Sequence, residues 1–126
     1  MCEEVQRKLQ SELDSFKNTQ KELQKIVLTR QQLDGQLNEN EIVKVELDSL
    51  ATDAKVFKSV GPVLIKTELA EAKQNVTKRM DYISKEIKRI DDQIAVLEKK
   101  QDNHRESLQK LQHQFQQAQV KAAMQA

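Results

Sequence analysis

The sequence predicts a mainly α-helical protein, a long antiparallel coiled coil of two helices joined by a β-hairpin that assembles with other chains into an inter-subunit β-barrel. Charged residues make up 33% of the 126 residues, and there is no Trp, one Tyr and three Phe. Two Gly and one Pro are too few to separate the strands of a larger sheet. Heptad repeats flank a β-branched segment that holds the only Pro. We expect one domain over 1–126, with helices over 1–50 and 67–122 and the hairpin over 54–66.

The C-terminal helix carries the clearest periodicity. Its seam positions alternate at steps of four and three residues, which is typical of a coiled coil, and no Gly or Pro interrupts them. A helix of about 54 residues is ~80 Å long, beyond the size of a compact domain. Lys73, Gln101 and His104 are polar exceptions, and we expect an interhelical role for His104. The seam comprises Leu69, Lys73, Val76, Met80, Ile83, Ile87, Ile90, Ile94, Leu97, Gln101, His104, Leu108, Leu111, Phe115, Ala118 and Ala122.

The N-terminal helix is less regular. One frame runs through Leu9, Leu13, Phe16, Gln20 and Leu23, and a second runs from Ile26 through Arg30, Leu33 and Leu37 to Leu47. The two consecutive steps of three residues around Leu23 predict a stammer, which overwinds a coiled coil locally.

The segment between the helices reads as a hairpin that turns at Gly61-Pro62. We expect Val56, Val60, Val63 and Ile65 on one face and Phe57 and Leu64 on the other, with Thr67 capping the next helix. A lone hairpin that is apolar on both faces and has two free edges is marginal in water. Other chains should therefore supply strands to it, most simply in a barrel; the alternative is a connector that folds back between the helices. The predicted assembly residues are Val56, Phe57, Val60, Gly61, Pro62, Val63, Leu64 and Ile65.

Apolar residues also gather near both termini, where the seam is weakened by Gln101 and His104. A loosened coil end could hold apolar segments of another protein, because Met and Leu repack easily. Judged on the residues alone, ordinary frayed helix ends are the favoured alternative. The candidate binding residues are Val5, Leu9, Leu13, Leu108, Leu111, Phe115, Val120 and Met124.

Other classes of function lack support in the sequence. There is no apolar run for a membrane span, no secretion signal and no basic patch for nucleic acid at a net charge of +1. His104 and His113 are nine residues apart and point to different sides of a helix, so no metal site is expected. No nucleotide or metal motif occurs, and we expect no enzyme activity and no cofactor. The single cysteine, Cys2, favours a reducing compartment, the cytoplasm.

The hairpin segment Val56–Lys66, with its Val-Gly-Pro-Val-Leu-Ile-Lys core, resembles the β-class subunits of prefoldin. Residues 36–44, 69–73 and 78–89 resemble the helices that flank it in that family. The resemblance implies a hexamer of two α-class and four β-class subunits, whose hairpins form a double β-barrel bearing six coiled coils. It implies that the distal tips hold non-native proteins, above all nascent actin and tubulin, without ATP, and pass them to the cytosolic group II chaperonin.

On this resemblance the hairpin residues serve assembly and the terminal apolar residues serve holding. The alternative is a structural coiled-coil tether or adaptor that holds no client. The hairpin distinguishes the holding subunit from the tether, because a simple tether needs no exposed apolar sheet between its helices.

Overall fold

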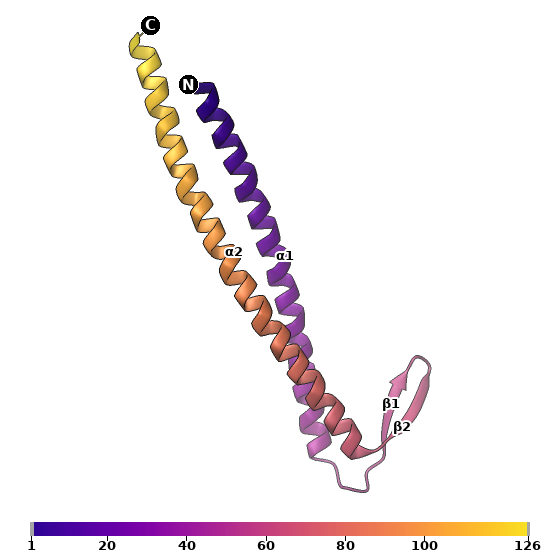
Figure 1. Ribbon diagram of the computed structural model, residues 1–126. Helices are drawn as coiled ribbons and strands as arrows, with labels where there is room; N and C mark the ends of the chain where they lie inside the picture. The colour runs from indigo at the N-terminus through magenta and orange to yellow at the C-terminus, as the bar shows by residue number, and fades with distance from the viewer. Residues whose placement is uncertain (1, 126) are drawn as a thin grey trace. The chain divides into compact units, whose positions relative to one another are not determined.

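The computed structural model describes residues 2–125 and confirms a mainly α-helical fold of two long helices joined by a β-hairpin (Figure 1). Helix α1 (Cys2–Asp48) is followed by strands β1 (Val56–Val60) and β2 (Val63–Thr67) and by helix α2 (Leu69–Gln125). The described residues form two compact units. Unit 1 contains 2–28 and 92–125, and unit 2 contains 29–91, including the hairpin.

The seam of α2 lies where the heptads predict it. Val76, Ile83 and Ile90 are buried, and the other seam positions from Leu69 to Ala118 are at least partly buried. Leu47 of α1 joins the three buried α2 residues as the apolar core of unit 2. Burying an aliphatic side chain of this size contributes about 1.5–3 kcal/mol. Only Ala122, the last predicted seam position, is exposed.

The seam of α1 differs from the prediction. One uninterrupted heptad frame runs through most of its partly and fully buried positions and takes the place of the predicted stammer, while Leu13, Ser15, Gln20 and Val27 beside this frame are partly buried as well. Polar residues occupy several of its positions: Glu12 and Thr19 lie in the frame directly beside Leu13 and Gln20, which the apolar pattern predicted and which are partly buried too. Thr19 is only 1% exposed, and its hydroxyl donates to the carbonyl oxygen of Ser15 at 3.0 Å. The frame is Val5, Leu9, Glu12, Phe16, Thr19, Leu23, Ile26, Arg30, Leu33, Leu37 and Asn40.

The hairpin has the predicted turn and faces. Val60 pairs with Val63 across a two-residue loop, and Gly61 has a φ of 58° while no non-glycine residue among the described ones has positive φ. A glycine with positive φ followed by Pro62 is the pattern of a type II′ turn, whose twist suits a hairpin. Because directly paired residues share a face, the register puts Val56, Val60, Val63 and Ile65 together and Phe57 and Leu64 opposite.

The predicted element boundaries need small corrections. Helix α1 ends at Asp48, and α2 runs from Leu69 to Gln125 rather than over 67–122. Thr67 does not cap α2: it ends β2, and its hydroxyl donates to the Ile65 carbonyl oxygen at 3.5 Å. The amide of Ala72 donates to the Glu68 carbonyl oxygen at 2.9 Å, which makes Glu68 the N-cap residue. The ladder with β1 keeps Thr67 extended, and the helix begins after it.

Candidate functional site

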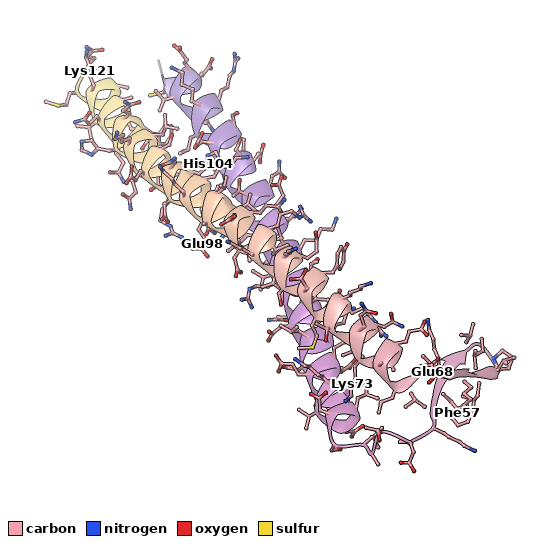
Figure 2. All side chains as sticks on the ribbon, turned by 60° about the horizontal axis from the view of Figure 1, so that its bottom comes forward. Phe57, Glu68, Lys73, Glu98, His104 and Lys121 are labelled. Carbon is pink, nitrogen blue, oxygen red and sulfur yellow. The ribbon has the colours of Figure 1, made fainter. Side chains whose placement is uncertain are left out.

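The first candidate surface is the hairpin, whose large apolar side chains are exposed on both faces. Phe57, Val60, Val63, Leu64 and Ile65 are between 49% and 67% exposed, whereas Val56 is partly buried at the base of the hairpin. In Figure 2 side chains project from both sides of the hairpin ribbon, and Phe57 lies at the base of the hairpin. The described part of the chain therefore leaves both apolar faces of this sheet exposed to water.

The two edges of the hairpin also carry unpaired backbone groups. In a type II′ turn Val60 and Val63 are joined by the turn hydrogen bond, and bonded and non-bonded pairs then alternate along the strands. The amides and carbonyls of Phe57 and Ser59 therefore point outward from β1, and those of Leu64 and Lys66 from β2. The sheet consists of these two strands, so both rows are available to a further strand.

The second candidate surface lies in unit 1, where the start of α1 and the end of α2 run side by side (Figure 1). Six of the eight predicted binding residues are partly buried there, so they pack between the two helices. The exceptions are Val120 and Met124, which are 58% and 82% exposed. The six are Val5, Leu9, Leu13, Leu108, Leu111 and Phe115.

Val120 and Met124 lie past the part of α2 that faces the described residues of α1 in unit 1. The two helices are antiparallel, so each contact between them fixes which residue of α2 lies opposite Cys2. The Glu12–His104 contact places Gln114 opposite Cys2, and the contact of Arg105 with the Phe16 ring places Gln119 there. By either count the last turn of α2 extends beyond the described start of α1. We call residues 120–125 the overhang.

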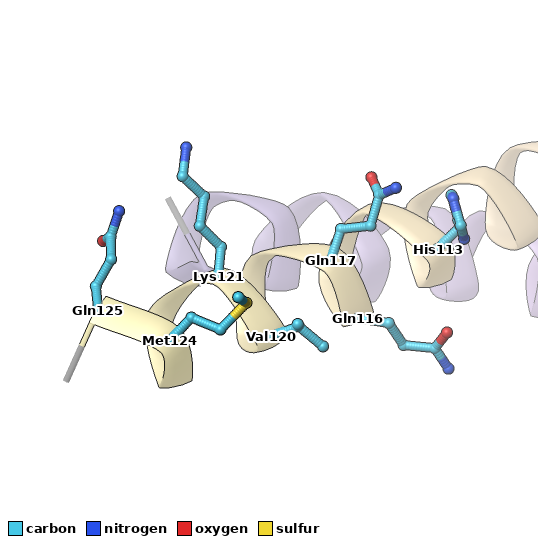
Figure 3. Close-up of a pocket in the computed structure, with 7 residues that line it drawn as sticks. All are labelled: His113, Gln116, Gln117, Val120, Lys121, Met124 and Gln125. Carbon is cyan, nitrogen blue, oxygen red and sulfur yellow. The ribbon is translucent and has the colours of Figure 1, made fainter.

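A shallow, open hollow runs along this end of α2 (Figure 3). Val120 and Met124 lie next to each other, with Gln116, Gln117 and Lys121 around them. From Ser107 to Gln125 the helix has no acidic residue and seven Gln. The overhang therefore presents an apolar pair in an amide-rich, weakly basic setting.

Polar contacts also join the helices within the described part of each unit, and of their α1 partners the sequence pattern placed only Arg30 in the seam. In unit 1 His104 Nδ1 lies 2.6 Å from Glu12 Oε1, while His104 Nε2 is buried without a hydrogen-bond partner among residues 2–125. This confirms the interhelical role expected of His104. Glu12 could have been found from the sequence, because the spacing of Leu9, Glu12 and Phe16 follows the alternation of three and four residues. The search for apolar residues alone passed over it.

In unit 2 the guanidinium of Arg30 holds the Asp91 carboxylate through two contacts, of 2.5 and 3.3 Å, and Lys73 Nζ lies 3.8 Å from Asp48 Oδ1. The hydrogen bond from Arg30 lowers the pKa of Asp91 and is also the main reason that the pKa of Arg30 is raised. Lys73, a polar exception in the α2 seam, thus has a partner across the coil.

Neither a metal centre nor a membrane span is found in the described part of the chain. Residues 2–125 contain no group of three or more His, Cys, Asp or Glu side chains placed to hold a metal ion. No helix in the same range has an apolar stretch long enough to cross a membrane.

Comparison with known proteins gives a consistent result. Residues 10–115 match the protein family described as prefoldin subunit. Prefoldin subunit 6 of Mus musculus is 48% identical over 123 residues, which cover 98% of this chain and 97% of the mouse protein. Probable prefoldin subunit 6 of Drosophila melanogaster is 50% identical over 119 residues, covering 94% of this chain and 93% of its own length.

A solved structure has the same fold. The crystal structure of the prefoldin beta subunit from Thermococcus strain KS-1 matches with a TM-score of 0.56 at 26% sequence identity. The match covers 88% of this chain and 91% of the archaeal chain.

Proposed function

Since this chain belongs to the prefoldin subunit family, we propose that it is one subunit of a hexameric, ATP-independent co-chaperone that holds non-native proteins. In this proposal the hairpin joins the other α- and β-class subunits in a β-barrel body. The distal ends of the coil hold clients such as nascent actin and tubulin, which are passed to the cytosolic group II chaperonin. The chain itself catalyses no reaction.

The observation that carries the assembly role is the exposure of apolar side chains on both faces of the hairpin. A sheet needs three or more strands, or a covering layer, to be stable in water. Strands from neighbouring subunits would bond the outward amides of Phe57, Ser59, Leu64 and Lys66 and cover both faces. A tether whose hairpin stayed uncovered would leave this surface open to aggregation.

Assembly is tested with a hairpin variant and a matched control. Phe57→Lys with Leu64→Lys places two charges on one hairpin face, where the native side chains are 53% and 67% exposed. Tyr82→Lys with Val96→Lys makes the same change at helix positions that are 65% and 68% exposed. We expect native mass spectrometry of complexes reconstituted with the other subunits to show loss of the hairpin variant and full incorporation of the control. Full incorporation of the hairpin variant would refute the assembly role.

The holding role is supported by the overhang, where Val120 and Met124 lie exposed beyond the described start of α1. Apolar side chains that residues 2–125 leave exposed can bind apolar segments of an unfolded protein. The partly buried residues beside them, such as Leu111 and Phe115, would join the binding surface where the coil end opens.

A photo-crosslinker can test holding without interference from the other subunits. With benzoylphenylalanine at position 120 in the assembled complex, denatured actin should be crosslinked to this chain; with the same group at position 96, it should not. Position 96 is a suitable control because Val96 is 68% exposed, more than Val120 at 58%, but lies outside the overhang. Equal labelling at both positions, or none at position 120, would remove the overhang from the mechanism.

A further inference from the structure

A groove opens in unit 2 between the base of the hairpin and the adjoining ends of the two helices. Its floor is formed by Leu47 of α1 and Val76 of α2, which are 8% and 4% exposed. Val43 and Phe57 line it as well and are 42% and 53% exposed. We call this the hairpin groove, an apolar trough that continues directly into the exposed faces of the hairpin.

The charges that line the hairpin groove are all positive. Lys58 of β1 and Arg79 of α2 are its only ionisable lining residues among those described, and both are exposed. Neither forms an ion pair within residues 2–125, although Arg30, Lys73, Lys85 and Arg89 of the same unit all do. The side-chain amide of Asn75, which also lines the groove, has no hydrogen-bond partner in that range.

We propose that the hairpin groove receives a segment of a neighbouring, non-identical subunit that carries an apolar side chain next to an aspartate or glutamate. The apolar side chain would lie over Leu47 and Val76, and the carboxylate would accept hydrogen bonds from Lys58 and Arg79. An apolar floor beside unpaired cations favours such a segment over a neutral one and disfavours a basic one. This inference rests on the proposed assembly through the hairpin.

Two observations favour a different subunit, rather than a second copy of this chain, as the occupant of the hairpin groove. Val56, Phe57 and Lys58 belong to both β1 and the groove, so a chain that pairs with the hairpin is already beside it. The hairpin segment 54–67 of this chain contains three lysines and no acidic residue. A second copy that offered its own hairpin would bring like charges together, which disfavours association.

Charge reversal tests the electrostatic half of the proposal. Lys58→Glu with Arg79→Glu should weaken assembly with the sister subunits about tenfold or more in Kd, whereas Lys78→Glu with Lys88→Glu should change it less than about twofold. The control lysines are exposed, lie in the same unit and form no ion pair within residues 2–125. In the first pair salt should strengthen assembly where it weakens that of the wild type, because the variant replaces an attraction by a repulsion and salt screens both. Equal effects of the two pairs would overturn the proposal.

A photo-crosslinker at position 75 identifies the occupant directly. In the assembled complex, mass spectrometry should find it joined to a sister-subunit peptide in which Asp or Glu stands next to apolar residues. A crosslink to a second copy of this chain, to a client or to a neutral or basic peptide contradicts the inference, as does the absence of any crosslink. The hairpin variant Phe57→Lys with Leu64→Lys separates the two proposals. If that variant assembles normally, the assembly role itself fails; if only the groove experiments are negative, the groove proposal alone fails.

Discussion

At the scale of single residues, the polar members of the seam are explained by their partners across the coil. The Glu12 and His104 side chains are 24% and 18% exposed and contact each other in unit 1. His104 Nε2 is buried with no partner among residues 2–125, so one hydrogen-bonding group in this layer of the seam has no hydrogen bond there. A pair of this kind is weak support for stability, and well-packed apolar replacements are often more stable.

Replacing both Glu12 and His104 by apolar residues should therefore stabilise the coil, whereas replacing only one of them should not. We expect Glu12→Leu with His104→Leu to raise the free energy of unfolding by about 1 kcal/mol or more. Each single substitution should lower it, because one polar group is then left without its partner. Thermal unfolding followed by circular dichroism measures all four proteins of this cycle. A double variant less stable than the wild type would contradict this view of the layer.

The Arg30–Asp91 pair predicts a dependence of stability on pH. Because the pKa of Asp91 is lowered in the folded protein, its contribution is fully present above the unfolded pKa of about 3.9 and is lost as pH falls through the folded pKa. Carboxyl NMR titration should find the Asp91 pKa below its ordinary value in the wild type and near that value in Arg30→Met. Arg89→Met is the control, since Arg89 pairs with Glu86 instead. An unchanged Asp91 titration in Arg30→Met would exclude Arg30 as the cause.

At the scale of elements, the two glycines have opposite roles. Gly61 has a φ of 58° in the turn between β1 and β2, whereas Gly35 lies inside α1 without positive φ. A Cβ added at either position meets no atom within 4 Å, so steric clash with neighbours does not distinguish them. Backbone conformation alone decides what a side chain does at each position.

The same substitution should thus act in opposite directions at these sites. Gly35→Ala should stabilise the protein by about 0.5–1 kcal/mol, because alanine loses less backbone freedom in a helix. Gly61→Ala should destabilise the hairpin by about 1–2 kcal/mol, the cost of a left-handed conformation for an L-residue. Urea unfolding measures the first change, and the Cα chemical shifts of residues 56–67 report the second. A hairpin equally populated in Gly61→Ala would show that the turn does not depend on positive φ.

At the scale of the whole molecule, the buried apolar residues of unit 2 lie in the coil, and the hairpin has its large apolar residues on the surface. The apolar core of the coil in unit 2, formed by Leu47, Val76, Ile83 and Ile90, is covered within the chain. The hairpin is not, because a pair of strands has no second layer. This difference is the physical basis for proposing that assembly completes the fold of the hairpin.

Hydrogen exchange should reveal this difference between coil and hairpin. In the isolated chain, the outward amides of Phe57, Ser59, Leu64 and Lys66 should exchange far faster than the seam amides around Ile83 and Ile90. In the assembled complex, the same outward amides should become protected, because neighbouring strands accept their hydrogen bonds. Outward amides that stay unprotected in the complex would mean that no strand is added at these edges.

The sequence by itself determined the two helices, the turn, the two apolar faces of the hairpin and the seam of α2. These features depend on local rules: heptad spacing, the positive φ that Gly61 accepts, and the alternation of side chains along a strand. Only the tertiary structure decided the N-terminal part of the α1 seam, because Glu12 is acceptable there for the sake of His104, which is distant in sequence. It also decided the hairpin groove, where residues from α1, β1 and α2 meet. No periodicity within one segment can show which side chains another segment will bring beside it.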